Sequence, residues 1–145
     1  MSAAGRVASP AAALLDSGVL IALHVRSDPC HADAVRWFQN FRGVLHTVEA
    51  VLTETASFIP PAARGRLAEF AASGRLRMHG IHAGGHARMA ELFRKYADQD
   101  PDWADLALVW VAESTGIARI ATLDVADFSV YRINGRKRFE LELLR

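Results

Sequence analysis

The pattern of hydrophobic and polar positions divides the chain into short apolar runs and segments with helical periodicity. An apolar run over 13–15 has the character of a short buried strand, and Ser17 offers an N-cap for a helix over 19–24. Asp28 followed by Pro29 predicts the start of the next helix, because proline is well accommodated at the first helical position. The same criteria predict further helices over 30–41, 49–59, 63–74, 86–97 and 102–116, and further strands over 44–48, 75–81 and 117–124.

Two segments near the end of the sequence, 128–133 and 139–144, alternate on either side of Asn134-Gly135. This dipeptide favours a tight hairpin turn, so we expect two antiparallel strands there. Over the preceding part of the chain, predicted strands alternate with predicted helices. That order predicts a parallel α/β sheet covered by helices on both faces.

Composition limits the class of protein. The 145 residues, 51% of them hydrophobic, indicate one domain over 13–145 after a flexible lead-in over 1–12. The formal net charge is +1, so any nucleic-acid binding would need a local basic patch. The one cysteine, Cys30, excludes an intramolecular disulfide and is typical of a reducing compartment. We see neither a membrane-spanning stretch nor a secretory signal, and therefore expect a cytoplasmic protein.

Acidic residues occur where such a sheet places its binding sites. Asp16 and Asp124 each follow an apolar run, and sites in parallel α/β sheets lie beyond the carboxyl ends of the strands. Glu54 lies beside the apolar stripe of its predicted helix, and Asp105 comes three residues after Asp102. Helix capping or surface exposure explains each acid when it is taken alone.

Four segments carry a more specific signal when they are taken together. They are LLDSGVLIALH at 14–24, VLTE at 51–54, DWADLALVWVAE at 102–113 and ATLDVADF at 121–128. In this order and at this spacing the chain resembles PIN domains, and most of all the VapC toxins of type II toxin–antitoxin (VapBC) systems. The resemblance extends over the chain from about Ala13. It implies a PIN-like (Rossmann-like) three-layer α/β/α sandwich with a central, mainly parallel sheet.

The resemblance also implies a site. In that family three aspartates and one glutamate meet at one edge of the sheet, and the matching residues here are Asp16, Glu54, Asp105 and Asp124. Secondary matches are two acids beside that core, Asp127 and Asp102, and a hydroxyl two residues before the last acid, Thr122.

Four carboxylates a few ångströms apart repel one another unless protons or cations neutralise them. Oxygen ligands without cysteine or histidine favour Mg²⁺ or Mn²⁺ over zinc. We expect Asp16 and Asp124 to be the central ligands, Asp105 to complete the site and Glu54 to hold or orient water. The resemblance implies an endoribonuclease toxin that hydrolyses RNA phosphodiester bonds with metal-activated water, forms a homodimer and binds a small VapB-like antitoxin.

Other residues are candidates with simpler alternatives. RNA phosphates would need positive charge, and the candidates are Arg132, Arg136, Lys137, Arg138 and the pair Arg94-Lys95. A solvated turn is the simpler explanation of the NGRKR segment at 134–138. Three histidines, His79, His82 and His86, suggest zinc, but the glycines among them argue against a rigid ligand helix. Tryptophans at helical spacing are more often core or dimer contacts than base-stacking platforms.

One alternative keeps the fold and changes the function. A non-catalytic PIN-like module would bind RNA or protein without metal-dependent turnover. A receiver domain needs two adjacent early acids and a late lysine, and a dehalogenase-like phosphatase needs Asp-x-Asp. The segment Asp16-Ser17-Gly18 fits neither pattern.

Overall fold

The structure is a computed structural model, and it describes residues 11–142 of the chain. At its centre is a five-stranded sheet in the order β3-β2-β1-β4-β7, in which every neighbouring pair is parallel. Its strands are β1 (Ala11–Leu15), β2 (Gly43–Val48), β3 (Leu76–His79), β4 (Arg119–Ala121) and β7 (Glu140–Glu142).

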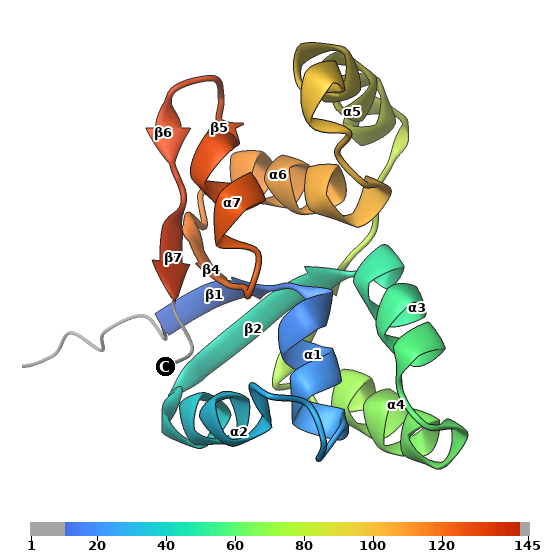
Figure 1. The fold of residues 1–145 in the computed structure, drawn as a ribbon. Helices are drawn as coiled ribbons and strands as arrows, with labels where there is room; N and C mark the ends of the chain where they lie inside the picture. The colour runs from blue at the N-terminus through green and yellow to red at the C-terminus, as the bar shows by residue number, and fades with distance from the viewer. Residues whose placement is uncertain (1–10, 143–145) are drawn as a thin grey trace, which may run out of the picture.

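Helices cover both faces of this sheet, as Figure 1 shows, with α1 to α4 on one side and α5 to α7 on the other. They are α1 (Ser17–His24), α2 (His31–Asn40), α3 (Glu49–Phe58), α4 (Arg64–Ala72), α5 (Ala83–Lys95), α6 (Trp103–Thr115) and α7 (Val125–Val130). Two 3-10 turns, Pro61–Ala63 and Ala97–Gln99, precede α4 and follow α5. The parallel α/β/α sandwich predicted from the sequence is therefore confirmed. Within the described residues, no helix has the length and apolar character needed to cross a membrane.

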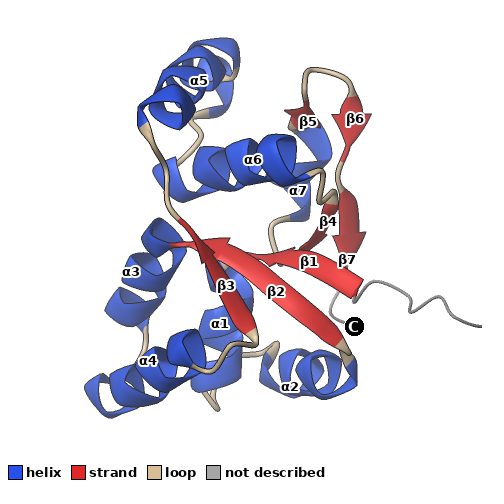
Figure 2. Cartoon of the chain, turned by 180° about the vertical axis from the view of Figure 1, so that it is seen from behind, coloured by secondary structure: helices blue, strands red, loops and turns tan. Residues whose placement is uncertain are grey.

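The order of the strands creates a switch point beside β1. From β1 the chain adds β2 and β3 on one side, and it later adds β4 and β7 on the other (Figure 2). Leu14 and Leu15 of β1 pair with Ile120 and Ala121 of β4. In open α/β sheets, ligands bind beyond the carboxyl ends of the strands at such a switch point, because the following loops diverge there.

α6 is apolar on nearly every side because it lies inside the hydrophobic core. Eight of its residues are buried, including Leu106 and Leu108, both with no exposed surface. A helix that is hydrophobic around most of its circumference is stable only where packing encloses it. α6 is enclosed by the sheet, α5 and the hairpin that follows α7, and this fixes its N-terminal turn near the switch point.

The strand predicted over 128–133 is wrong in its first half. Val125–Val130 forms α7, because Asp124 accepts a hydrogen bond from the Asp127 amide at the start of the helix and Phe128 is buried. The turn at Asn134-Gly135 is confirmed, with φ values of 53° and 72°, and it joins the short antiparallel strands β5 (Arg132–Ile133) and β6 (Lys137–Arg138). The segment 139–144 does not pair in this hairpin: its described part forms β7 and joins β4 in parallel, while 143–144 lie outside the described residues.

Several helix and strand boundaries also differ from the prediction. Asp16, not Ser17, caps α1, and α5 begins three residues before the predicted start because His82 caps it. β1 begins at Ala11, so 11 and 12 belong to the sheet although they were expected in the lead-in, whose other residues lie outside the described part. Local pattern locates such elements but sets their ends only within a few residues.

Candidate active site

Asp16 is placed where β1 ends and α1 begins. Its backbone amide donates to the carbonyl of Ala121 at 3.1 Å, which anchors it to the end of β4. Its Oδ1 accepts from the Ser17 amide at 2.8 Å, and its Oδ2 accepts from the Thr122 hydroxyl at 2.9 Å. Burial raises the pKa of Asp16 to about 6, although these two hydrogen bonds oppose the rise.

Thr122 connects the ends of the two central strands. While its hydroxyl donates to Asp16, the same oxygen accepts from the Asp124 amide at 2.9 Å. Its side chain is buried, so both bonds are shielded from water. One hydroxyl therefore fixes the relative positions of the acids that follow β1 and β4.

Asp105 lies in the first turn of α6. The Asp102 carboxylate caps that helix by accepting from the Asp105 amide at 2.8 Å. Asp105 is buried, and its Oδ2 accepts from the Tyr131 hydroxyl at 3.0 Å. Burial, followed by the charges of Asp102 and Asp16, raises the pKa of Asp105 to about 8. Near neutral pH this carboxyl group therefore tends to keep its proton unless a cation compensates its charge.

Carboxylates from α6 and α7 converge beside these residues. Oxygens of Asp105, Asp124 and Asp127 all lie within 4.8 Å of one another. Burial and the neighbouring Asp124 carboxylate raise the pKa of Asp127. Three carboxylates so close, with a buried fourth acid nearby, form a donor set of the kind that hard divalent cations prefer.

The four acids matched by the resemblance line one cavity of about 350 Å³. Its lining residues are Asp16, Ser17, Gly18, Glu54, Asp102, Asp105, Leu123 and Asp124. Glu54 enters it from α3, where its Oε1 accepts a 2.6 Å hydrogen bond from the Ser17 hydroxyl. The resemblance gives Asp127 only as a secondary match. Its carboxylate nevertheless has an oxygen within 4.8 Å of oxygens of Asp105 and Asp124.

Two residues of the site are not among the candidates that the sequence offers. The sequence predicts only a helix cap for Ser17 and a strand position for Tyr131. A hydroxyl directly after Asp16 was a weak signal for the first. Nothing local pointed to Tyr131, which lies 26 residues from Asp105 in sequence.

None of the predicted basic residues lines this cavity. Arg132 donates from Nη1 to the backbone oxygens of Ser129, Val130 and Tyr131, so it closes the end of α7. The exposed side chains of Arg136, Lys137 and Arg138 belong to the hairpin tip and its second strand. Lys95, at the end of α5, lies against the tip, with its amine 3.7 Å from where a Cβ on Gly135 would stand.

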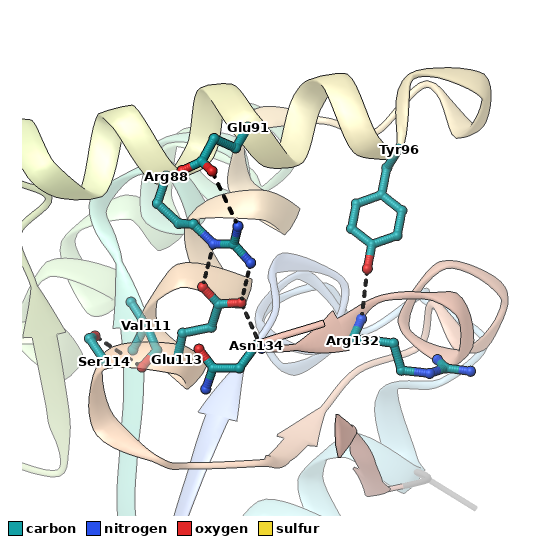
Figure 3. A network of polar contacts seen from close by, with 8 residues as sticks. All are labelled: Arg88, Glu91, Tyr96, Val111, Glu113, Ser114, Arg132 and Asn134. Carbon is teal, nitrogen blue, oxygen red and sulfur yellow. Dashed lines mark hydrogen bonds and ion pairs between the residues drawn. The ribbon is translucent and has the colours of Figure 1, made fainter. Parts of the chain in front are cut away.

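A polar network holds this hairpin to the helices, as Figure 3 shows. Glu113, near the end of α6, accepts from Arg88 Nε at 2.8 Å, from Arg88 Nη2 at 3.0 Å and from the Asn134 amide at 2.8 Å. Eight residues of helix separate Asp105 from Glu113, or roughly 12 Å along the axis. The basic tip and the acids therefore flank opposite ends of α6.

The three histidines considered for zinc have separate partners. His79 stacks on His46, with Nε2 of His79 2.7 Å from Nδ1 of His46. His82 accepts from the Gly85 amide and so caps α5, while His86 lies beside Trp103. Within the described residues these histidines do not converge on one point, which argues against a zinc site. Trp37 and Trp110 pack against the core, whereas Trp103 is 54% exposed.

Comparison with known proteins decides the family. Residues 13–133 match the PIN domain family. The chain is a PIN domain. A search of curated proteins finds no match.

Solved structures show where this PIN domain's fold recurs. One is a Mycobacterium tuberculosis toxin, VapC20, described as a sarcin-ricin loop cleaving toxin; it is 20% identical with a TM-score of 0.69, over 76% of this chain and 87% of that one. Another is a toxin–antitoxin complex from Klebsiella pneumoniae, 17% identical with a TM-score of 0.62, over 81% of this chain and 91% of that one. At these identities the similarity establishes the shared fold.

Proposed function

We propose that this PIN domain is a metal-dependent endoribonuclease of the VapC toxin type, which hydrolyses RNA phosphodiester bonds. The observation that carries the proposal is the convergence of the Asp105, Asp124 and Asp127 carboxylates, beside the buried Asp16. Membership of the PIN family and a fold shared with a toxin described as sarcin-ricin loop cleaving support the same conclusion.

The donor chemistry fits Mg²⁺ or Mn²⁺. The converging ligand atoms of Asp105, Asp124 and Asp127 are carboxylate oxygens, and burial, with the charges of neighbouring acids, raises the pKa values of Asp16 and Asp105. The residues that would hold the ion are Asp105, Asp124 and Asp127, whose oxygens converge, together with the neighbouring Asp16; Asp102 and Glu54 lie around them. When bound, the ion supplies activation of water and neutralises charge that develops on the phosphate.

The chain's own residues orient the reaction. Thr122 fixes one oxygen of Asp16, and the backbone caps fix Asp102 and Asp124 at the starts of their helices. Ser17 holds one oxygen of Glu54, which leaves the other available to accept a hydrogen bond from water in the cavity. Glu54 is then the residue placed to orient the attacking water.

We further propose a small VapB-like antitoxin as partner. One structure with this fold is described as a toxin–antitoxin complex. A groove of about 420 Å³ between α1, α2 and α4 is lined by Leu23, His24, Val35, Phe38, Gln39, Arg66 and Phe70. Its apolar residues fit the apolar face of a partner helix. Co-purification with the product of an adjacent reading frame tests this partner, and light scattering tests the homodimer expected from the resemblance.

The central experiment is RNA cleavage by the full chain with and without Mg²⁺ or Mn²⁺. We expect metal-dependent cleavage that leaves a 5′-phosphate, and loss of at least about 100-fold in rate for Asp16→Asn. Asp33→Asn, at an exposed acid paired with Arg36 on α2, is the control and should cleave normally. RNA binding without metal-dependent turnover would favour the non-catalytic module, and undiminished cleavage by Asp16→Asn would refute the role of Asp16.

A further inference from the structure

Tyr131, at the C-terminal end of α7, places a buried hydroxyl against Asp105, one of the acids that line the cavity. Its side chain has no exposed surface, and its hydroxyl donates to Oδ2 of Asp105 at 3.0 Å. In the described part of the chain no N–H or O–H group donates to Oδ1 of Asp105, and the other polar neighbour of this carboxylate is the side chain of Asp102, an acceptor like itself. Of the two oxygens of this carboxylate, therefore, only Oδ2 accepts a hydrogen bond from a side chain.

Two aromatic contacts hold the Tyr131 ring. Tyr96 and Phe128 pack edge-to-face against it, with ring centroids 5.1 Å and 5.3 Å away. The Arg132 amide, directly after Tyr131, donates to the Tyr96 hydroxyl at 2.9 Å. Because Phe128 belongs to α7, which Asp124 caps, the ring links the acid of α6 to the acids of α7.

We propose that Tyr131 is a positioning residue for the cation site: its hydroxyl holds Oδ2 of Asp105, so that Oδ1 is the oxygen presented to a divalent ion. This inference rests on the proposed metal-dependent function. Mg²⁺ requires near-ideal octahedral geometry, and a carboxylate fixed through one oxygen cannot turn to offer both. Residues that hydrogen-bond a ligand in this way commonly change metal affinity by 10- to 100-fold.

A purely structural role for the hydroxyl predicts a different result, and the chain offers a matched control. Tyr96 is also a buried tyrosine whose hydroxyl makes one hydrogen bond inside the same aromatic cluster, but its partner is a backbone amide. Tyr131→Phe and Tyr96→Phe therefore remove the same atom from neighbouring rings. Only the first substitution changes a carboxylate of the site.

The test is calorimetric titration of Mn²⁺ into the metal-free full chain, with urea unfolding and the electron paramagnetic resonance spectrum of bound Mn²⁺ recorded in parallel. We expect Tyr131→Phe to raise the Mn²⁺ dissociation constant by about 10-fold or more and to alter the spectrum. Tyr96→Phe should leave both within about twofold, while urea midpoints fall similarly for the two variants.

Other outcomes would overturn the proposal. Wild-type affinity in Tyr131→Phe, or equal weakening by Tyr96→Phe, would leave Tyr131 a structural residue while the nuclease proposal stands. Absence of Mn²⁺ binding by the unsubstituted protein would end both proposals together. If Tyr131→Phe does not fold, Phe128→Leu keeps the hydroxyl and loosens the ring, and unchanged Mn²⁺ affinity in that variant would reject the inference.

Discussion

The Ser17 hydroxyl donates to Oε1 of Glu54 across 2.6 Å and thereby joins the first turn of α1 to the middle of α3. A hydrogen bond this short to a carboxylate is of the charge-assisted kind, which is about twice as strong as a neutral one. It holds Glu54 at the cavity although that residue lies on a half-exposed helix face.

Removal of this hydroxyl should impair catalysis more than stability. We expect Ser17→Ala to slow RNA cleavage by about 10-fold, because Glu54 would lose the contact that orients it. Ser57→Ala is the control. Ser57 lies on α3, the helix of Glu54, and its hydroxyl donates only to the Thr53 carbonyl. Equal rates for the two variants, measured under single-turnover conditions, would contradict an orienting role for Ser17.

Stability of the metal-free protein should fall as pH rises. The pKa values of Asp16 and Asp105 in the folded state are about 6 and 8, against 3.8 for an ordinary aspartate, so between pH 4 and pH 8 the folded protein holds protons that the unfolded chain has lost. We expect urea unfolding in the presence of a chelator to give an unfolding free energy lower by on the order of 4–5 kcal/mol at pH 8 than at pH 5.

Two changes should reverse that loss. Mg²⁺ should restore stability at pH 8, because it binds the ionised carboxylates. Asp105→Asn should flatten the pH dependence and stabilise the metal-free protein at pH 8, since it removes the acid with the higher pKa. An unfolding free energy that rises from pH 5 to pH 8 would show that folding does not raise the pKa values of these carboxyl groups.

Glu113 should contribute far more to stability than its neighbour Glu91, although both contact Arg88 (Figure 3). The Glu113 side chain is 8% exposed and also accepts from the Asn134 amide, whereas Glu91 is 58% exposed and 3.8 Å from the guanidinium. We expect Glu113→Ala to cost about 2–3 kcal/mol and Glu91→Ala below about 0.5 kcal/mol in urea unfolding. Faster hydrogen exchange of the Asn134 amide in Glu113→Ala alone would localise the effect to the hairpin.

The basic hairpin should bind RNA through phosphates and not through base edges. Replacement of Arg136, Lys137 and Arg138 by alanine should weaken binding to all sequences alike. Each lost phosphate contact on a single strand reduces the slope of log affinity against log salt by roughly 0.7, so we expect a change of up to about 2. An unaltered slope in fluorescence titrations would assign these cations to a solvated turn.

The positions of Asp16 and Asp124 at the ends of strands were predictable, because they depend on local sequence and one topological rule. Apolar runs before Asp16 and Asp124 identify strand ends, and parallel strands bring those ends to one edge. Glu54 and Asp105 were different, because a helix position alone does not tell a surface acid from one that enters a cavity. They were assigned through the order and spacing of four motifs.

The parts that the sequence did not reveal depend on tertiary contacts. Segment 125–130 has too few residues for its periodicity to separate helix from strand, and the cap at Asp124 together with the burial of Phe128 decides for helix. Tyr131 contacts Asp105 because the C-terminal end of α7 lies beside the first turn of α6 in the folded chain. Contacts between residues so distant in sequence leave no local signal.

Three acids of the cavity, Asp16, Asp102 and Asp124, also accept the amide hydrogen bonds that begin α1, α6 and α7. Their backbone positions are consequently set when the helices form, before any ion arrives. Metal uptake should then resemble the filling of a rigid socket, with a small heat-capacity change and little rearrangement of the chain. Because these three acids also cap helices, a substitution that abolishes activity at any of them also weakens the start of a helix. Glu54 caps no helix, so a stable inactive variant is most easily obtained there.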